Sequence, residues 1–539
     1  MLSPPVSKNV TFCQIVFAGK IIVLAGALLL LSRNINRPFT GWHEDNNALY
    51  SYFARNNIYY GLGYTKLFNV FGDTQTPPAK PEGYLNHPPL LNLWVAIPMF
   101  IFGDHEWVGR SVPIATTLGS AWLLMIIISR LQSPVLGLLT GLFYVTMPIT
   151  AYFGRMLDHT SPVQFFSLLM LHGYLQWMGL YGNSYNRKAG AVYYILGAVL
   201  GIGTGWAAVI MAGLIWLWHI CRCFQDPNLC RLIWWLVIIP SFSLSTVLLH
   251  ILWSCNWNID WFVSLFLSRT ADLKNSATYL PGKMWLFRNW TYLNRHISVF
   301  GIGAAVSYPV IVMGILRHTA PDSVFRQIVR HRSSVAPILL TLLQGLIWIF
   351  LFRRQSEIHD YWQYFMTPFF AVAMAAVVLT TFKLLSGWNY RIAIYITLLL
   401  ILLPIPSFAE SLDIIYQLPA DQKYTQYIQS VVSILKRLNQ YVPPRIPVMT
   451  SENYQSGEPL GVHTNDFTVA QIIYYANRPL IHSTDINEIQ ANRQGCATYI
   501  LKATNDPNIY QLAQKLAEKY RPLYTEANYI IFSLNHQSH

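Results

Sequence analysis

The sequence predicts a polytopic α-helical membrane protein of about eleven spans and a juxtamembrane helix, with a small C-terminal α/β or α+β domain. Of the 539 residues, 53% are hydrophobic and only 11% are charged, which is less charge than soluble proteins of this size carry. Apolar runs of bilayer length recur as far as residue 409. From residue 410 to 539, short β-like runs alternate with helical stretches, which indicates a separate soluble domain.

A spanning helix needs about 20 largely apolar residues. The run from 190 to 221 is interpreted as two passes that turn near Gly203, Thr204 and Gly205. The predicted spans are 14–32, 111–129, 134–152, 162–181, 190–206, 207–221, 232–252, 297–316, 334–352, 362–382 and 391–408. No small-residue cleavage site follows the first of them, which we therefore interpret as a retained helix.

Positive charge between the spans predicts their orientation. With the N-terminus in the cytoplasm, every short inner connection carries at least one basic residue, as the positive-inside rule requires. These residues are Arg130, Arg187, Lys188, Arg222, Arg231, Arg317, Arg326, Arg330, Arg332, Lys383 and Arg391. The net charge of +13 is thereby explained without a nucleic-acid partner, and membrane lipids are the expected surroundings. An extracytoplasmic C-terminal domain fits a bacterial plasma membrane, and the endoplasmic reticulum would give the same topology.

One apolar segment does not fit as a span. Residues 88–103 are short, carry Pro98 in the middle, and as a full span would place the basic connections outside. We interpret them as a juxtamembrane or re-entrant helix. Long outer loops then run from about 33 to 110 and from about 253 to 296, on a membrane body over 1–409.

Polar residues gather in three outer segments. In the first, at 41–56, Glu44 and Asp45 are adjacent acids that suit a general base or a metal ligand, or else simply begin an amphipathic helix. In the second, Arg155, Asp158 and His159 occupy a short turn between two spans. Confinement of an acid beside a histidine favours function, although a helix-capping ion pair is the alternative.

The third segment, 352–368, places Arg353 and Arg354 on the side where short loops otherwise avoid positive charge. An arginine fork matches phosphate geometry, and a lipid phosphate would lie at this depth; snorkelling to headgroups is the alternative explanation. Other candidates lie nearby or in the long outer loops. They are Glu357, His359, Tyr361, Tyr84, His87, Arg269 and Lys283.

Five short motifs follow one another along the chain. They are the acid pair at 44–45, Y-x-x-H-P-P-L at 84–90, F-G-x-x-E-W-x-x-R at 102–110, R-x-x-D at 155–158 and H-D-Y-W at 359–362. In this order the chain resembles the C-type (GT-C) integral-membrane glycosyltransferases of the protein O-mannosyltransferase and lipid A aminoarabinose transferase group. The resemblance covers most of the membrane body, and in the C-terminal domain it is confined mainly to YYANRPLI at 474–481.

The resemblance implies inverting transfer of a hexosyl or pentosyl group from a polyprenyl-phosphate donor to a protein, lipid or glycan acceptor at the outer membrane face. Asp45 would be the base, with Glu44 as neighbour or substitute, and Asp158 the acid of the second loop. Arg353 or Arg354 would stabilise the departing phosphate, with Lys283 and Arg269 as further candidates.

The resemblance also leaves two points open. A divalent metal is a candidate cofactor, with Asp45, Asp158 and His87 as candidate ligands. However, some relatives have an acid and a lysine where this chain has Asn86 and His87, which weighs against a metal there. A transporter or flippase of a lipid-linked anion is the rival function; it would favour charged groups at mid-membrane depth, and the predicted spans carry almost no acids.

Overall fold

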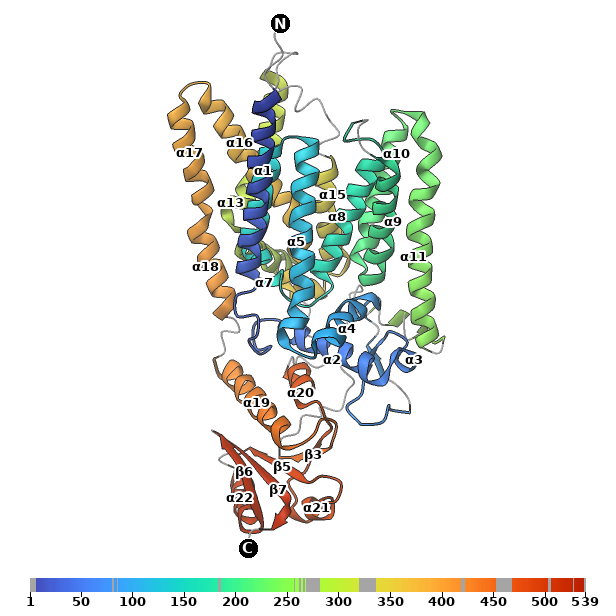
Figure 1. Ribbon diagram of the computed structural model, residues 1–539, viewed down its shortest axis with the longest axis vertical. Coiled ribbons are helices and arrows are strands. Elements are labelled where there is room, and N and C mark those ends of the chain that lie inside the picture. The colour runs from blue at the N-terminus through green and yellow to red at the C-terminus, as the bar shows by residue number, and fades with distance from the viewer. Residues whose placement is uncertain are drawn as a thin grey trace. The chain divides into compact units, whose positions relative to one another are not determined.

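The computed structural model describes residues 6–79, 82–84, 86–182, 186–255, 257–260, 263–264, 267, 282–318, 336–417, 422–451, 468–502, 506–526 and 528–537 (Figure 1). The chain divides into two units. The helical unit comprises Met1–Ile35, Asn86–Leu91 and Arg110–Tyr416. The mixed unit comprises Asn36–Leu85, Asn92–Gly109 and Gln417–His539, so it joins most of the first long loop to the C-terminal residues.

The helical unit consists of helices throughout its described part. Five described segments are long and apolar enough to cross a membrane, namely Gln14–Leu31, Glu106–Leu131, Pro227–Ser254, Asp360–Ser386 and Tyr390–Tyr416. This confirms a mainly helical integral membrane protein, while the count of about eleven spans stays a prediction. The elements wholly or mainly in this unit are α1 (Val6–Leu31), α5 (Glu106–Leu131), α6 (Pro134–Thr146), α7 (Pro148–Phe153), α8 (Thr160–Trp177), α9 (Arg187–Thr204), α10 (Ala207–Cys223), η1 (Pro227–Leu232), α11 (Ile233–Ser254), α13 (Gly282–His318), α15 (Ala336–Leu351), η2 (Gln355–Glu357), η3 (Asp360–Met366), α16 (Thr367–Ser386), α17 (Tyr390–Leu402) and α18 (Pro404–Gln417).

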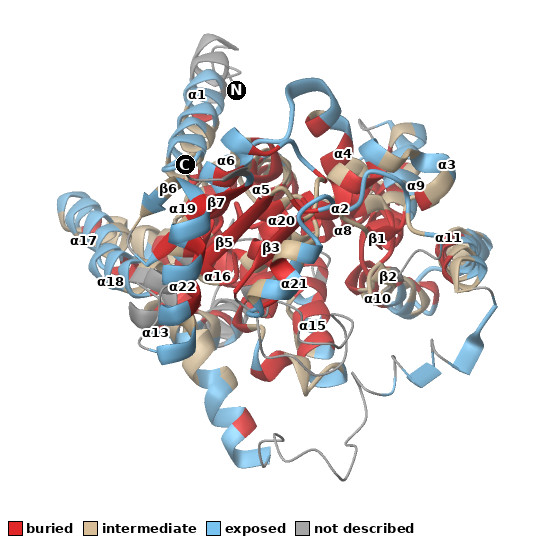
Figure 2. Ribbon diagram, turned by 90° about the horizontal axis from the view of Figure 1, so that it is seen from below, coloured by how far each residue is buried: buried red, intermediate tan, exposed pale blue. Residues whose placement is uncertain are grey.

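Glycines determine how closely α8 and α9 approach. A Cβ atom on Gly173 of α8 would collide with the backbone of α9, and one on Gly190 or Gly197 of α9 would collide with the backbone of α8. Such close backbone contact is how membrane helices gain packing energy without a hydrophobic driving force. Figure 2 shows that α8 and α16 are largely buried, whereas α11 and α17 expose much of their surface.

The helices agree with one predicted break between spans and add a second break that was not predicted. The run from 190 to 221 breaks between Thr204 and Ala207, where the sequence predicts a turn. The predicted span 134–152 is instead two helices, because Pro148 disfavours a helical conformation at Met147, whose φ and ψ are −56° and 135°. The short α7 leads directly into the polar turn at 154–159.

The mixed unit combines helices with two sheets. Its elements are α2 (Asp45–Tyr60), α3 (Leu62–Thr65), β1 (Asn69–Phe71), β2 (Glu82–Tyr84), most of α4 (Leu90–Phe102), α19 (Gln422–Tyr441), β3 (Val448–Thr450), α20 (Thr468–Ala476), β4 (Leu480–His482), α21 (Ile486–Ala491), β5 (Thr498–Lys502), α22 (Pro507–Lys519), β6 (Tyr520–Glu526) and β7 (Tyr529–Gln537). Helix α4 has 13 residues and contains Pro98. The segment is therefore a short helix, and its juxtamembrane or re-entrant placement stays a prediction.

The C-terminal sheet has the order β4-β3-β5-β7-β6. Strand β3 pairs in parallel with β4 and β5, while β7 pairs antiparallel with β5 and β6. Helix α22 begins at Pro507 after Asp506, whose side chain accepts a hydrogen bond from the backbone N–H of Asn508 as a helix cap. Leu512 and Leu516 of this helix pack with Tyr499 and Phe532 of the sheet in one buried core.

Candidate functional site

The acid pair of the first loop belongs to the mixed unit, and its members have different surroundings. Glu44 is 3% exposed, and its Oε2 accepts hydrogen bonds from the backbone N–H of Gly41 at 2.7 Å and of Thr40 at 3.0 Å. The same oxygen lies 3.4 Å from an Nη of Arg37. Asp45 is the first residue of α2 and is half-buried. Glu44 therefore stabilises the turn that leads to Asp45. The different surroundings of the two acids cannot be deduced from their adjacent positions in the sequence.

Tyr84, also in the mixed unit, has mainly a packing role in the described contacts. Its ring stacks on Phe53 of α2, with centroids 5.7 Å apart and planes 21° apart. Its carbonyl accepts a hydrogen bond of 2.9 Å from the side-chain amide of Asn69. These contacts fix the β1–β2 hairpin against α2.

The second polar segment forms a buried ionic cluster in the helical unit. Nδ1 of His159 lies 2.6 Å from Oδ1 of Asp158, and the hydroxyl of Thr160 donates to Oδ2 at 2.5 Å. The ring of His87 stacks on that of His159 with centroids 4.2 Å apart. Burial by itself raises the pKa of Asp158, but the charge and hydrogen bond of His159, the charge of His87 and the Thr160 hydroxyl together hold this pKa well below its ordinary value.

A carboxylate oxygen can only accept, so Nδ1 of His159 carries the proton in its bond to Asp158. Nε2 of His159 then points the other way, in the arrangement by which a carboxylate orients a catalytic imidazole. The sequence-predicted Asp158 and His159 are thus brought together, and His87 joins them. Asp158 holds the ring of His159 by its Nδ1, which leaves Nε2 on the far side of the ring.

A row of aromatic rings links this cluster to the third polar segment. Ring centroids lie 6.0 Å apart for His159 and Trp348, 5.1 Å for Trp348 and Trp362, and 5.1 Å for Trp362 and His359. Nε2 of His159 and the Nε1 groups of Trp348 and Trp362 are buried and have no hydrogen-bond partner among the residues that the structure describes. A buried polar group without a partner costs free energy, so these three nitrogens mark where a ligand or water is expected.

The third segment packs against the start of α13. The guanidinium of Arg353 lies over the ring of Trp285, 5.3 Å from its centroid, and the indole N–H of Trp285 donates to the carbonyl of Arg353 and to the hydroxyl of Ser356. Glu357 is buried, and its carbonyl accepts a hydrogen bond of 2.7 Å from the hydroxyl of Tyr292. These contacts fix the chain around Arg353, which is itself half-buried.

Other predicted residues are dispersed. Arg155 is buried, donates to the carbonyl of Arg33 and lies over the ring of Tyr416. Lys283 is exposed in the first turn of α13, Arg354 is half-buried, and Arg269 lies outside the described residues.

A second Asp–His pair was not predicted as a site. Nε2 of His296 lies 3.0 Å from Oδ2 of Asp360, and both side chains are at most 1% exposed. Phe153 joins this pair to the candidate residue Tyr361, since its ring centroid is 5.5 Å from those of both His296 and Tyr361. Asp360 lies in the H-D-Y-W motif at 359–362, whereas His296 was signalled only by its place directly before an apolar run.

The described residues do not fit the predicted divalent metal. Nowhere in the described ranges do three or more His, Cys, Asp or Glu side chains gather as a metal site would require. The two oxygens of Asp158 already accept hydrogen bonds from His159 and Thr160. We therefore derive no chemistry through a metal ion.

Comparison with known proteins places the fold. No protein-family model and no curated protein matches the chain. Among solved structures, it is similar to ArnT from Cupriavidus metallidurans bound to undecaprenyl phosphate, with a TM-score of 0.56 and 13% identity over 95% of this chain and 97% of that one. It is also similar to the archaeal oligosaccharyltransferase AglB from Archaeoglobus fulgidus in complex with an inhibitory peptide and a dolichol-phosphate, with a TM-score of 0.51 and 12% identity over 95% and 74% of the two chains.

The complex of the Archaeoglobus fulgidus oligosaccharyltransferase with Zn and sulfate matches with a TM-score of 0.50 and 12% identity, over 95% of this chain and 73% of that one. The likeness extends through nearly the whole of the present chain in each comparison. The chain therefore has the GT-C fold of the integral-membrane glycosyltransferases, as its sequence motifs predict.

Proposed function

We propose that this protein is a membrane glycosyltransferase that moves a hexosyl or pentosyl group from a polyprenyl-phosphate donor to a protein, lipid or glycan acceptor at the outer face of a bacterial plasma membrane. The observation that carries the proposal is the pair of buried residues Asp158 and His159, on which the half-buried His87 stacks, inside an apolar helical unit. Ionisable groups in such surroundings are costly and mark functional sites. The fold supports the same conclusion, since its solved examples include complexes with undecaprenyl phosphate and dolichol-phosphate.

The proposed reaction is a single displacement with inversion. Asp45 takes the proton of the acceptor hydroxyl, whose oxygen forms a bond to the anomeric carbon. The bond from that carbon to the phosphate oxygen breaks, and its electron pair leaves with the polyprenyl phosphate. Asp45 is preferred to Glu44 as the base because the Oε2 of Glu44 already accepts two backbone N–H bonds and lies near Arg37.

The proposed donor-binding groups belong to the helical unit. Arg353 and Arg354, supported by Lys283, stabilise the charge that develops on the leaving phosphate, for which planar guanidinium groups are suited. The buried nitrogens of His159, Trp348 and Trp362 bind hydroxyl groups of the sugar. These hydroxyl groups supply the hydrogen-bond partners that the three nitrogens do not find among the described residues. Further pocket residues proposed from the sequence are Tyr84, His87, Arg155, Glu357, His359 and Tyr361.

The test is sugar transfer by purified protein from a panel of polyprenyl-phosphate sugars. We expect wild type to release polyprenyl phosphate and Asp45→Asn to lose about 10²-fold or more in kcat, the usual contribution of a general base. Glu44→Gln is the matched control. It keeps an acceptor oxygen for the turn, so its kcat should fall by no more than about 10-fold.

The two variants also decide between the acids. A large loss in Glu44→Gln with an active Asp45→Asn would move the base to Glu44. If wild type consumed no donor yet bound polyprenyl phosphate, the glycosyltransferase proposal would fail in favour of transport.

A further inference from the structure

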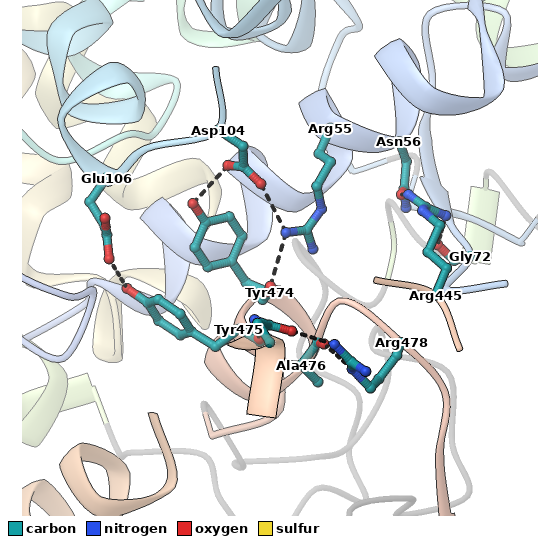
Figure 3. A network of polar contacts seen from close by, with 11 residues as sticks. Arg55, Asn56, Gly72, Asp104, Glu106, Arg445, Tyr474, Tyr475, Ala476 and Arg478 are labelled. Carbon is teal, nitrogen blue, oxygen red and sulfur yellow. Dashed lines mark hydrogen bonds and ion pairs between the residues drawn. The ribbon is translucent and has the colours of Figure 1, made fainter. Parts of the chain in front are cut away.

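The C-terminal part of the mixed unit holds the loop segment that carries Asp45. Helix α20 carries two adjacent tyrosines, Tyr474 and Tyr475, in its last turn, and Figure 3 shows both side chains in contact with residues from the first long loop of the chain. Both tyrosines are at most 5% exposed. Their contacts reach the loop on each side of Asp45.

The first contact lies just before Asp45. The hydroxyl of Tyr475 accepts a hydrogen bond of 2.7 Å from the backbone N–H of Phe39 and donates to Oε1 of Glu106 at 3.2 Å. Lys436 of α19 binds the same oxygen of Glu106, so its charge balances that carboxylate. Phe39 is fully buried, and its ring packs against the rings of both tyrosines.

A short, hydrogen-bonded turn connects this contact to Asp45. Thr40 and Gly41, which follow Phe39, donate their backbone N–H groups to Glu44, and Asp45 comes next as the first residue of α2. Six residue steps therefore separate Phe39 from Asp45, and the intervening residues 40–44 form the turn that Glu44 closes. A shift in the position of Phe39 therefore also shifts Asp45.

The second contact lies further along α2. Arg55 donates one Nη both to the carbonyl of Tyr474 and to Oδ2 of Asp104, at 3.0 Å each, and the hydroxyl of Tyr474 donates to the other oxygen of Asp104 at 2.8 Å. One residue on, Oδ1 of Asn56 accepts a 2.7 Å hydrogen bond from Arg445. Figure 3 shows these contacts as one network.

We infer that Tyr475 is a positioning residue for the transfer reaction, and that the C-terminal domain holds Asp45 in place through the Tyr475–Phe39 hydrogen bond and the Arg55 and Arg445 contacts. The inference rests on the proposed function in taking Asp45 as the base. A base must lie within hydrogen-bond reach of its proton, and a misplacement of about 1 Å costs up to about 10²-fold in rate.

The variant Tyr475→Phe tests the inference because it removes only the hydroxyl group. Tyr499→Phe is the matched control, since Tyr499 is also buried in the C-terminal domain but donates its hydroxyl to the carbonyl of Ser483, within the sheet region. We expect Tyr475→Phe to lower kcat by about 10-fold while the KM for the donor changes by less than about 2-fold. Tyr499→Phe should leave both values near those of wild type.

Hydrogen exchange gives a readout that does not need activity. In Tyr475→Phe, backbone amides in peptides covering residues 39–56 should exchange faster than in wild type, and in Tyr499→Phe they should not. Unchanged exchange in Tyr475→Phe, or equal effects of the two variants on kcat and exchange, would overturn the inference. A wild type that transfers no sugar would refute the proposed function, and the exchange result would still decide whether Tyr475 holds the loop.

Discussion

Among single residues, buried polar atoms differ in whether they find a hydrogen-bond partner. The carboxylate of Asp158 accepts from two side chains, whereas Nε2 of the adjoining His159 has no partner in the described part of the chain. The first group is stabilised in its charged form, and the second is left available for a ligand. This contrast between Asp158 and the nitrogens without a described partner leads to two separate predictions.

The first concerns the pH dependence of stability. Because the folded pKa of Asp158 lies below that of an unfolded aspartate, about 3.9, the ionised carboxylate stabilises the fold above that pH. This contribution is lost as the pH falls through the folded pKa. We expect the Tm difference between wild type and Asp158→Asn to shrink as the pH falls below about 4. Thermal unfolding in detergent measures it, and a difference that did not change between about pH 5 and about pH 2 would contradict it.

The second prediction concerns the indole N–H of Trp348, which has no hydrogen-bond partner among the described residues. Trp348→Phe removes the N–H donor and part of a buried ring, so we expect the KM for the sugar donor to rise by about 2- to 10-fold and the Tm to fall less than in Trp285→Phe, which loses the same ring volume and two hydrogen bonds as well. Trp285→Phe is the comparison, because its N–H donates to Arg353 and Ser356 and its removal should lower the Tm. Donor kinetics and thermal unfolding measure both. A lower Tm with unchanged KM in Trp348→Phe would show that the indole only supports packing.

Among whole elements, the sequence predicts those whose signal is local. The turn between α9 and α10 is predicted from Gly203 to Gly205, and the short α4 from its length and Pro98. The break at Met147 was missed because its two short helices together have the length and hydropathy of one span. The His296–Asp360 pair joins residues 64 positions apart, and no local pattern encodes that contact.

The packing of α8 on α9 gives a prediction at this scale. Gly197→Ala places a methyl group against the backbone of Met170, which cannot move without displacing the helix, so we expect a destabilisation of about 1–3 kcal/mol. Gly213→Ala in α10 is the matched control, because a Cβ there meets nothing within 4 Å. Unfolding of both variants in detergent measures the difference. Equal stability of the two would show that α8 and α9 can separate at little cost.

For the whole molecule, the grouping of residues into units departs from their order in the chain. The sequence places a composition boundary near residue 410, and the mixed unit also takes in residues 36–85 and 92–109. The hydrogen bond from Phe39 to Tyr475 spans 436 positions, and the one from Arg445 to Asn56 spans 389. Composition reports whether a segment suits lipid or water, but not which distant polar segment it contacts.

The orientation of the chain in the membrane is the prediction with the widest consequence, because an outer-face reaction requires it. The positive-inside rule places the connection between α10 and α11 in the cytoplasm and the C-terminal domain outside. Cys230 is an exposed cysteine in that connection, and Tyr510 is 62% exposed on α22. Two reporters therefore follow, Cys230 alone and Tyr510→Cys, each in a chain whose other cysteines are replaced by serine.

A membrane-impermeant maleimide added to right-side-out vesicles should label Tyr510→Cys and leave the Cys230 reporter unlabelled, whereas inside-out vesicles should give the opposite pattern. Opening the vesicles with detergent should allow both reporters to react, which controls for their accessibility. Labelling of both from one side of intact vesicles would mean an even number of passes over residues 231–509, where the predicted topology requires an odd number. Because Phe39 is hydrogen-bonded to Tyr475, Asp45 lies on the same side as the C-terminal domain, and the orientation predicted from the basic connections would be wrong.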